Sequence, residues 1–265
     1  MEKRLTWGDF LEFPLQGRLS KPRKTGITMV MDKGLGLEST RDLLETAGNY
    51  IDYLKLGFGT SAFYSEELLR KKIALARCYS VNIYPGGTFF EVAILQKKVN
   101  QFLSRAKQLG FKTLEISDGT IELPIKSRQE MIKQALECGF EVITEVGKKD
   151  PRDRVSNESI TNLIKMDLEF GASKVIVEAR ESGSGVGCFD DKGLLKEEDF
   201  VVILQNCINP GRVIWEAPLK QQQTELIIRL GSNVNLGNIA VSEVLALEAL
   251  RVGLRGDTLR NSLVK

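Results

Sequence analysis

Apolar and polar positions follow one another along the chain in a repeating order. Short apolar runs, many of them rich in valine and isoleucine, lead into a glycine or polar turn and then into a longer segment with helical periodicity. Short continuous runs of this kind are typical of strands that are covered on both faces of a parallel sheet. The pattern predicts eight parallel strands, which begin at Ile27, Tyr50, Tyr79, Thr113, Glu141, Lys174, Arg212 and Asn233.

The segments between these runs place apolar residues three and four positions apart, which predicts amphipathic helices. The clearest cover 65–76, 89–110, 127–139 and 157–171, and the last three of them end in glycine. Eight strand and helix pairs within about 250 residues are the size and order of a (β/α)₈ TIM barrel. We therefore predict an α/β protein with a single TIM-barrel domain over residues 1–265 and a short N-terminal lead-in over about residues 1–25. A doubly wound sheet, which has fewer strands, is the alternative.

Charge and cysteine usage exclude several classes of protein. Lysine and arginine total 37 against 35 aspartate and glutamate, a net charge of +2, so we expect no nucleic-acid or membrane partner. The four cysteines have no short spacing, which argues against a zinc site or a disulfide framework and favours a cytoplasmic location. We also expect no signal peptide and no transmembrane segment, because no apolar run approaches the roughly 20 residues that span a bilayer.

The chain contains no histidine. This absence excludes Ser-His-Asp and Cys-His catalysis, as well as zinc sites built on imidazole. Any chemistry must rely on lysine, arginine, carboxylates, hydroxyl groups or a bound metal.

Nearly every predicted strand ends in a polar group, and these ends form the active-site face of a TIM barrel. The residues at these ends are Asp32, Lys33, Lys55, Asn82, Glu115, Asp118, Glu145, Lys148, Lys149, Glu178, Arg180, Glu216, Asn235 and Asn238. Alternation along the strands directs Lys33, Lys55 and Glu216 into the mouth of the barrel, whereas Glu115 lies in a polar row that leaves its direction open.

Several partly buried carboxylates cost on the order of several kcal/mol per ion unless something compensates them. Structural salt bridges are one form of compensation. A divalent cation, together with lysines and an arginine that hold an anionic ligand, is the other. Oxygen ligands without histidine favour Mg²⁺ or Mn²⁺ over zinc.

Three other segments allow two interpretations each. The turn GLGLES at Gly34 is a partial dinucleotide-binding GxGxxG motif, but Ser39 replaces its third glycine and eight repeated units favour a barrel. The polar loop 181–193 is either a mobile lid over the mouth or an ordinary surface loop. The basic residues Arg18, Lys21, Arg23 and Lys24 either close the bottom of the barrel or add charge to an anion site.

Nine ordered motifs closely resemble the phosphosulfolactate synthase family over about Lys21 to Thr258. They are KPRKTGITMVMDKGLG, YIDYLKLGFGTS, YPGGTFFE, LEISDGT, EVGKK, VIVEARESG, IWEAP, NLGNI and LRVGLRGDTLR. The resemblance implies a TIM-barrel enzyme, classed as a carbon–sulfur lyase, that adds sulfite to phosphoenolpyruvate with Mg²⁺ and forms (2R)-3-phosphosulfolactate. That product feeds coenzyme M synthesis in archaea, and a related route leads to sulfolactate in some spore-forming bacteria.

The resemblance and the chemistry together suggest a role for each strand-end residue. We hypothesise that a subset of Glu115, Asp118, Glu145, Glu178 and Glu216 holds Mg²⁺. Sulfite attacks C3 of phosphoenolpyruvate, and we expect Lys148 to deliver a proton to C2, with Lys149 as the rival for this role. The candidates for binding the sulfite, phosphate and carboxylate groups are Lys33, Lys55, Arg180 and Asn235.

Two other functions stay open at this point. The family also includes plant heat-stress-associated proteins, so a non-catalytic barrel is one alternative. A phosphate-binding aldolase or lyase that uses Lys55 or Lys148 as a Schiff base is the other. In each case we expect a homo-oligomer.

Overall fold

The computed structural model describes residues 7–8, 10–150, 152–153, 155–179, 182–185, 187–207 and 209–263. Eight parallel strands form one sheet in the order β3-β2-β1-β8-β7-β6-β5-β4. They are β1 (Thr28–Asp32), β2 (Tyr53–Leu56), β3 (Asn82–Pro85), β4 (Thr113–Ile116), β5 (Glu141–Val146), β6 (Lys174–Val177), β7 (Val213–Glu216) and β8 (Leu236–Ala240). The first and last strands of this order, β3 and β4, lie against each other, so the sheet nearly closes on itself.

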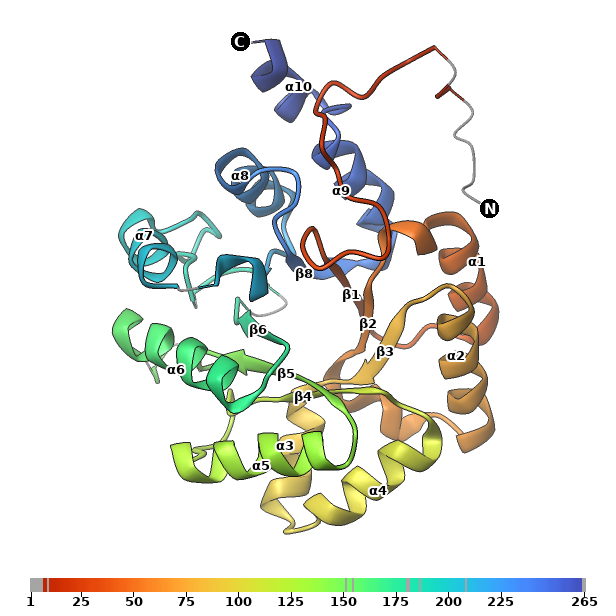
Figure 1. The fold of residues 1–265 in the computed structure, drawn as a ribbon, viewed down its shortest axis with the longest axis vertical. Coiled ribbons are helices and arrows are strands. Elements are labelled where there is room, and N and C mark those ends of the chain that lie inside the picture. Colours follow the sequence, from red (N-terminus) through yellow and green to blue (C-terminus); the bar gives the residue numbers. More distant parts are fainter. Residues whose placement is uncertain are drawn as a thin grey trace.

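Helices surround the strands on the outside (Figure 1). They are α1 (Leu37–Ala47), α2 (Glu66–Cys78), α3 (Gly87–Leu95), α4 (Val99–Leu109), α5 (Ile125–Glu137), α6 (Asn157–Phe170), α7 (Glu197–Asn206), α8 (Lys220–Leu230), α9 (Val244–Arg251) and α10 (Gly256–Leu263). Short 3₁₀ segments cover Gly48–Tyr50, Gly57–Phe63, Pro210–Arg212 and Val241–Glu243. The predicted TIM barrel is confirmed, and the cyclic order of the strands excludes the doubly wound alternative.

The region predicted as one helix over 89–110 forms two helices. The chain breaks after α3, where Lys97 has a φ of 55° in the left-handed region. α4 then ends as expected at Gly110, whose φ of 100° suits a residue without a Cβ. The chain changes direction at this break, and α3 packs against α4 through Phe90 and Phe102. At the start of α3, the Gly87 N–H donates to a β4 glutamate.

Two apolar layers stabilise the barrel. The larger layer packs the outer faces of the strands against the helices. A smaller layer fills the barrel interior with Ile27, Met29, Tyr53, Tyr84, Ile143, Ile176 and Ile214. Ile51, which precedes β2, packs in the outer layer. Above the inner layer, at the carboxyl ends of the strands, the interior becomes polar.

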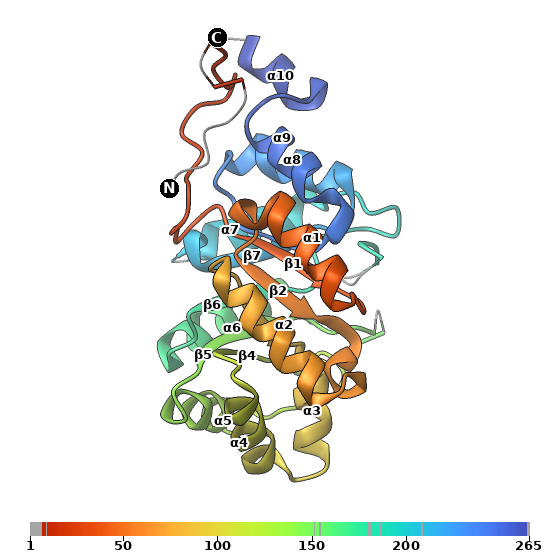
Figure 2. The ribbon, with the colours of Figure 1, turned by 90° about the vertical axis from the view of Figure 1, so that its right-hand side faces the viewer.

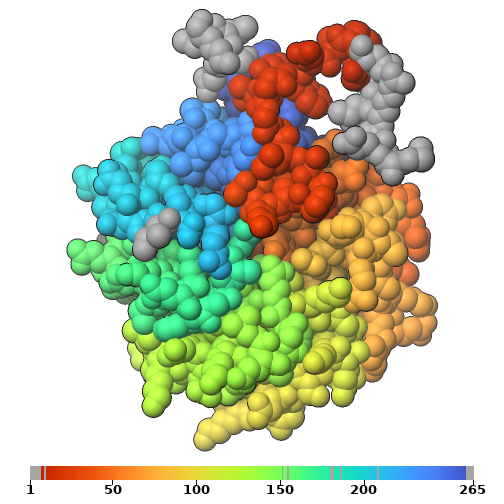
Figure 3. Space-filling view, viewed as in Figure 1, coloured from red at the N-terminus to blue at the C-terminus, as the bar shows by residue number. Residues whose placement is uncertain are grey.

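The N-terminal segment packs against the opposite end of the barrel. Arg18 pairs with Glu248 at 2.9 Å, and Arg23 pairs with Asp52 at 2.9 Å just before β2. Lys21 donates to the carbonyls of Gly48 and Tyr79, which precede β2 and β3. Figure 2 shows this segment and α10 at the same end of the molecule, and Figure 3 shows the segment lying across the surface. These basic residues close the bottom of the barrel.

Candidate active site

Four buried glutamates meet at the carboxyl ends of neighbouring strands. Glu115 lies in β4, Glu145 lies in β5, Glu178 directly follows β6, and Glu216 ends β7. Each is at most 3% exposed. The parallel strands bring residues that are far apart in the sequence to one edge of the barrel, so these carboxylates form a single cluster, which we call the glutamate cluster.

Lys55, at the end of β2, contacts three of the four carboxylates. Its Nζ lies 3.0 Å from Glu115 Oε1, 2.9 Å from Glu145 Oε2 and 3.7 Å from Glu216 Oε1. Burial opposes the charge of this lysine, but the surrounding glutamates outweigh burial and raise the pKa of Lys55 well above its usual value. Lys55 is therefore a fixed ammonium group in the floor of the site.

Lys149 approaches the same cluster from the loop after β5. Its Nζ lies 3.2 Å from Glu145 Oε1 and 3.7 Å from Glu178 Oε2, and it donates to Thr88 Oγ1 at 2.8 Å. The side chain is 30% exposed, so its ammonium group faces both the cluster and the open mouth. Burial disfavours its charge, but Glu145 and Glu178 outweigh burial and raise the pKa of Lys149.

Among the described residues, two lysines contact the four carboxylates, and burial and these lysines shift the pKa values of the glutamates in different directions. Burial raises the pKa of Glu115 to about 7, against the opposing effect of Lys55. Burial and the neighbouring charge of Glu216 raise the pKa of Glu178 well above its usual value. For Glu145, burial acts the same way, but Lys149 and Lys55 outweigh it and lower the pKa. The cluster therefore takes up protons or another source of positive charge.

The glutamate cluster contains a carboxylate oxygen that could bind a metal ion, although its glutamates are spread over several strands. Within the described part of the chain, no three Asp, Glu or Cys side chains converge closely enough to form a metal site by themselves. Glu115 Oε2, however, is buried and has no hydrogen-bond partner. Mg²⁺ is commonly held by one or two carboxylates, and water and substrate oxygens complete its octahedron. The donor set therefore fits Mg²⁺ bound through a pair of glutamates.

A glycine at the start of α3 completes this wall of the site. The Gly87 N–H donates to Glu115 Oε1 at 2.7 Å. A Cβ at this position would lie 2.4 Å from Ser117 Oγ and 2.7 Å from Glu115 Oε1, so only glycine fits. The sequence shows the glycine pair 86–87 directly after a predicted strand, but neither Gly87 nor Thr88 is among the predicted site residues. A pair of glycines indicates that another group comes close to the backbone there. The sequence did not indicate that this group is Glu115.

Lys148 and Asp118 lie outside the glutamate cluster. Lys148 Nζ donates to the carbonyls of Asp118 and Ile121 at 2.7 and 2.8 Å. Asp118 also pairs with Arg128 at 3.0 Å, and Arg128 is anchored to Asp167 at 2.6 Å. These contacts tie the loops after β4 and β5 together. Lys148 lines a different hollow of about 660 Å³, near the starts of α6 and α7. The structure thus separates Lys148 from Lys149, although they are adjacent in the sequence.

The remaining basic candidates occupy different places. Lys33 is exposed on the loop after β1, and its Nζ lies 5.8 Å from the centre of the Phe58 ring. Its neighbour Asp32 points outward and forms a fully buried ion pair with Lys72 at 2.6 Å. Arg180, predicted to bind an anionic group, lies outside the described residues, as does Glu181 in the predicted lid.

Asn235 is at the wrong end of the barrel for a substrate-binding residue. β8 begins at Leu236, the next residue, so Asn235 lies at the bottom of the barrel rather than at the carboxyl end of the strand. Its Oδ1 accepts from the Ile27 N–H at 3.0 Å, and its Nδ2 donates to the carbonyls of Gly211 and Val213. The amide joins β1, β7 and β8 and has a structural role. The prediction failed because the apolar run was too short to locate the strand.

The sequence from residue 16 to residue 257 matches the family model of (2R)-phospho-3-sulfolactate synthase (ComA). The chain belongs to this family. It is 46% identical to the phosphosulfolactate synthase of Methanothermobacter thermautotrophicus over 253 residues, which cover 95% of this chain and 96% of that protein. It is 39% identical to the phosphosulfolactate synthase of Bacillus subtilis, over 94% of this chain and 97% of that protein.

The comparisons also find one more distant sequence relative and several structural neighbours. The chain is 23% identical to Protein HEAT-STRESS-ASSOCIATED 32 of Arabidopsis thaliana, over 92% of this chain and 91% of that protein. The 3-hexulose-6-phosphate synthase of Salmonella typhimurium superposes with a TM-score of 0.56 at 11% identity, covering 86% of this chain and all of that chain. Phosphonopyruvate hydrolase gives a TM-score of 0.56 at 15% identity over 90% and 83% of the two chains. At such identities the two structural likenesses show the barrel fold alone.

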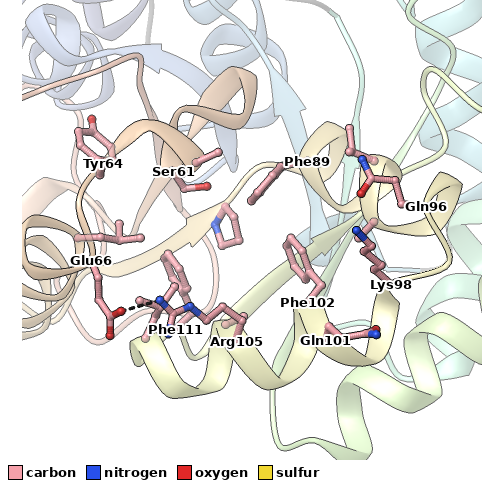
Figure 4. Close-up of a pocket in the computed structure, with 17 residues that line it drawn as sticks. Ser61, Tyr64, Glu66, Phe89, Gln96, Lys98, Gln101, Phe102, Arg105 and Phe111 are labelled. Carbon is pink, nitrogen blue, oxygen red and sulfur yellow. Dashed lines mark hydrogen bonds and ion pairs between the residues drawn. The ribbon is translucent and has the colours of Figure 1, made fainter.

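The phosphosulfolactate synthase fold also contains an apolar cavity away from the glutamates. It measures about 420 Å³ and lies in the helical layer among α2, α3 and α4. Figure 4 shows Phe89, Phe102 and Phe111 in its wall and the ion pair of Glu66 and Arg105 at its edge. Apart from this ion pair it offers few charged groups, so the glutamate cluster is the candidate active site. None of the helices in the described residues is both long enough and apolar enough to cross a bilayer.

Proposed function

We propose that this chain catalyses the Mg²⁺-dependent addition of sulfite to phosphoenolpyruvate, which forms (2R)-3-phosphosulfolactate and a new carbon–sulfur bond. Membership of the phosphosulfolactate synthase family supports this reaction. The observation that carries the proposal is the cluster of four buried glutamates around Lys55 and Lys149 at the carboxyl ends of the strands. Such a cluster is costly for folding alone, and its charge suits a reaction that needs a cation and an acid.

Within this proposal, Glu115 and Glu178 are the best candidates to hold Mg²⁺. Glu115 has a buried oxygen with no hydrogen-bond partner, and burial raises the pKa values of both Glu115 and Glu178. Glu145 and Glu216 complete the negative wall. When bound, the cation would supply positive charge that offsets the charge developing on the substrate carboxylate.

We assign the proton transfer to Lys149. As the sulfur lone pair attacks C3, the electrons of the C2–C3 double bond move to C2, which then requires a proton on one face. The Lys149 ammonium carries that proton at the mouth, and Thr88, Glu145 and Glu178 hold it in place. A proton donor must reach the reacting atom. Lys149 meets this requirement better than Lys148, because the Lys148 ammonium is held by two backbone carbonyls. The amine recovers its proton from bisulfite or water.

The charge of Lys55 argues against Schiff-base chemistry. An imine forms from a neutral amine, whereas three glutamates within 3.7 Å keep Lys55 as an ammonium. Lys55 instead limits repulsion between the glutamates and an incoming anion. Lys33 and Arg180 stay predicted anion-binding residues on the rim.

The proposal is tested by ³¹P NMR of purified protein with phosphoenolpyruvate and sulfite, with and without Mg²⁺. A new phosphoester resonance that requires both sulfite and Mg²⁺ is expected, with no release of inorganic phosphate. A folded protein that gives no such resonance contradicts the proposal and favours the non-catalytic alternative. The Lys149→Met variant serves as the matched inactive control, since it leaves Lys55 in place.

The cellular setting stays a prediction of the sequence. We propose a cytoplasmic homo-oligomer whose product enters sulfolactate or coenzyme M synthesis. Light scattering of the purified protein measures its assembly state, and a monomer at micromolar concentration would contradict that part of the proposal.

A further inference from the structure

β8 contains a bulge at the mouth of the barrel. Thr28 of β1 pairs with Leu236, but Val30 pairs with Ile239, so the register shifts by one residue between them. Met29 on β1 therefore faces two residues of β8, Gly237 and Asn238. A bulge that adds one residue bends the strand and redirects side chains, and such bulges are frequent beside active sites.

Asn238 adopts a backbone conformation that few residues accept. Its φ is 54°, in the left-handed region, where asparagine is tolerated better than most other residues that carry a Cβ. Ser80 and Lys97, two other non-glycine residues with positive φ in the described chain, are exposed and lie outside the strands. Asn238, in contrast, lies in a strand and is 6% exposed.

The register places Asn238 on the inner side of the barrel. Leu236 and Ile239, which flank the bulge, both pack in the outer layer against the helices. Gly237 faces inward, because a Cβ there would lie 2.5 Å from Met29 Cε and 3.7 Å from Glu216 Cγ. Gly237 also pairs with Glu216 across the β7–β8 ladder. Asn238 follows it toward the carboxyl end, one residue beyond the position that pairs with Glu216.

The side chain of Asn238 has hydrogen-bonding capacity that the fold does not use. Its Oδ1 is buried and has no hydrogen-bond partner. An asparagine amide has two donors and an acceptor, and buried amides are normally satisfied. Asn235 shows the usual situation in the same strand region, with its Oδ1 and Nδ2 bonded to backbone groups of neighbouring strands. Among the described residues, Asn238 Nδ2 makes no hydrogen bond either, whereas Asn235 Nδ2 makes two. The Nδ2 donor of Asn238 is therefore available to an anionic ligand.

We propose that Asn238 is a further substrate-binding residue, whose side-chain Nδ2 donates a hydrogen bond to an oxygen of the anionic substrate beside Glu216. This inference rests on the proposed function, because it takes phosphoenolpyruvate as the ligand. The amide is uncharged, so it orients a phosphate or carboxylate oxygen without adding to the local charge. A neutral donor is suited to a wall that already carries the Glu216 carboxylate.

Asn238→Gly is the variant that tests this role. Glycine accepts the same φ without strain, so the bulge and the fold are retained and the melting temperature stays equal or rises. The amide is lost, and we expect the affinity for phosphoenolpyruvate by calorimetry and kcat/KM to fall about 10- to 100-fold, the usual effect of a hydrogen bond to a charged group. Ser80→Gly is the matched control, because it relieves the same conformation at an exposed site and leaves both values unchanged.

The Asn238→Asp variant tests whether the side chain acts as a hydrogen-bond donor. Aspartate preserves the shape but replaces the donor with a second negative charge, so we expect weaker binding of phosphoenolpyruvate than in Asn238→Gly. Wild-type affinity and kcat/KM in Asn238→Gly would overturn the inference while the proposed function stands. A wild-type protein that binds phosphoenolpyruvate but makes no sulfonated product contradicts the proposed reaction, and the calorimetric comparison then still decides the role of Asn238.

Discussion

Lys55 and Glu145 form an ion pair of 2.9 Å in the floor of the barrel mouth, and both side chains are less than one-tenth exposed. The pair joins β2 to β5 across the barrel interior, and Glu115 and Glu216 share the same ammonium group. A buried pair of this kind is held in place by its surroundings, and removing one partner leaves uncompensated charge.

The Lys55→Met variant is therefore expected to lose stability. Removing the ammonium leaves three of the four glutamates without their closest cation, and the expected loss in the free energy of unfolding is about 3 to 5 kcal/mol at pH 8. The loss should shrink at pH 6, because the glutamates can then take up protons. Urea denaturation measures both values. Lys71→Met, which removes an exposed pair of 2.6 Å with Glu67, is the control and should cost far less stability, because solvent screens this pair. Equal losses in the two variants would contradict this account of the cluster.

The two adjacent lysines after β5 are expected to differ sharply in catalysis. Lys149→Met removes the ammonium at the glutamate cluster, and kcat should fall about 10²- to 10⁴-fold, the usual contribution of a general acid. Lys148→Met breaks contacts with the Asp118 and Ile121 carbonyls, so it should lower stability but retain most of kcat. Steady-state kinetics of sulfite addition, compared with calorimetric binding of phosphoenolpyruvate, distinguishes the two effects. A far larger loss of kcat in the Lys148 variant would restore Lys148 as the acid.

Mg²⁺ is expected to stabilise the wild-type protein against heat. A ligand at about one hundred times its Kd adds about 2.7 kcal/mol, and for a chain of 265 residues this corresponds to roughly 5 to 10 °C. Glu115→Gln removes one of the excess carboxylates, so the metal-free variant should melt higher than wild type and respond less to Mg²⁺. Differential scanning calorimetry with EDTA or Mg²⁺ measures both shifts. An undiminished response to Mg²⁺ in Glu115→Gln would place the cation elsewhere.

The cysteines are expected to react with alkylating reagents in the order of their exposure and acidity. Cys78 is exposed, whereas burial raises the pKa of the Cys188 thiol from 9.0 to about 12. At pH 8 the thiolate of Cys188 is then on the order of one part in ten thousand, and its rate should rise about tenfold per pH unit below 12. Because folding raises this pKa, the contribution of the thiol to the free energy of unfolding declines as the pH rises from 9 toward 12.

Mass spectrometry after iodoacetamide treatment checks this order. The native protein should be labelled first at Cys78, and Cys188 should be labelled only after unfolding in urea. Rapid labelling of Cys188 in the native protein would contradict its position in the core.

The repeating order of apolar runs and amphipathic segments was sufficient to predict the barrel. Each run needed only to be short and apolar, and each helix only to present one apolar face, so local patterns determined the number of strands and their order along the chain. The same patterns identified Glu115, Glu145, Glu178, Glu216, Lys55 and Lys149 as strand-end residues. The resemblance of nine motifs to a family was visible in the sequence as well, and the family match confirms it.

The tertiary structure decided which of these groups meet. Lys148 and Lys149 are neighbours in the sequence, but the turn after β5 directs one toward the backbone of the β4 loop and the other into the glutamate cluster. Asn235 and Asn238 are three residues apart, but Asn235 precedes β8 at the bottom of the barrel, whereas Asn238 lies within β8 at a bulge. Register shifts and side-chain directions depend on contacts between distant segments. For that reason the sequence by itself determined the fold and the set of candidate residues, and only the folded chain selected the members of the site.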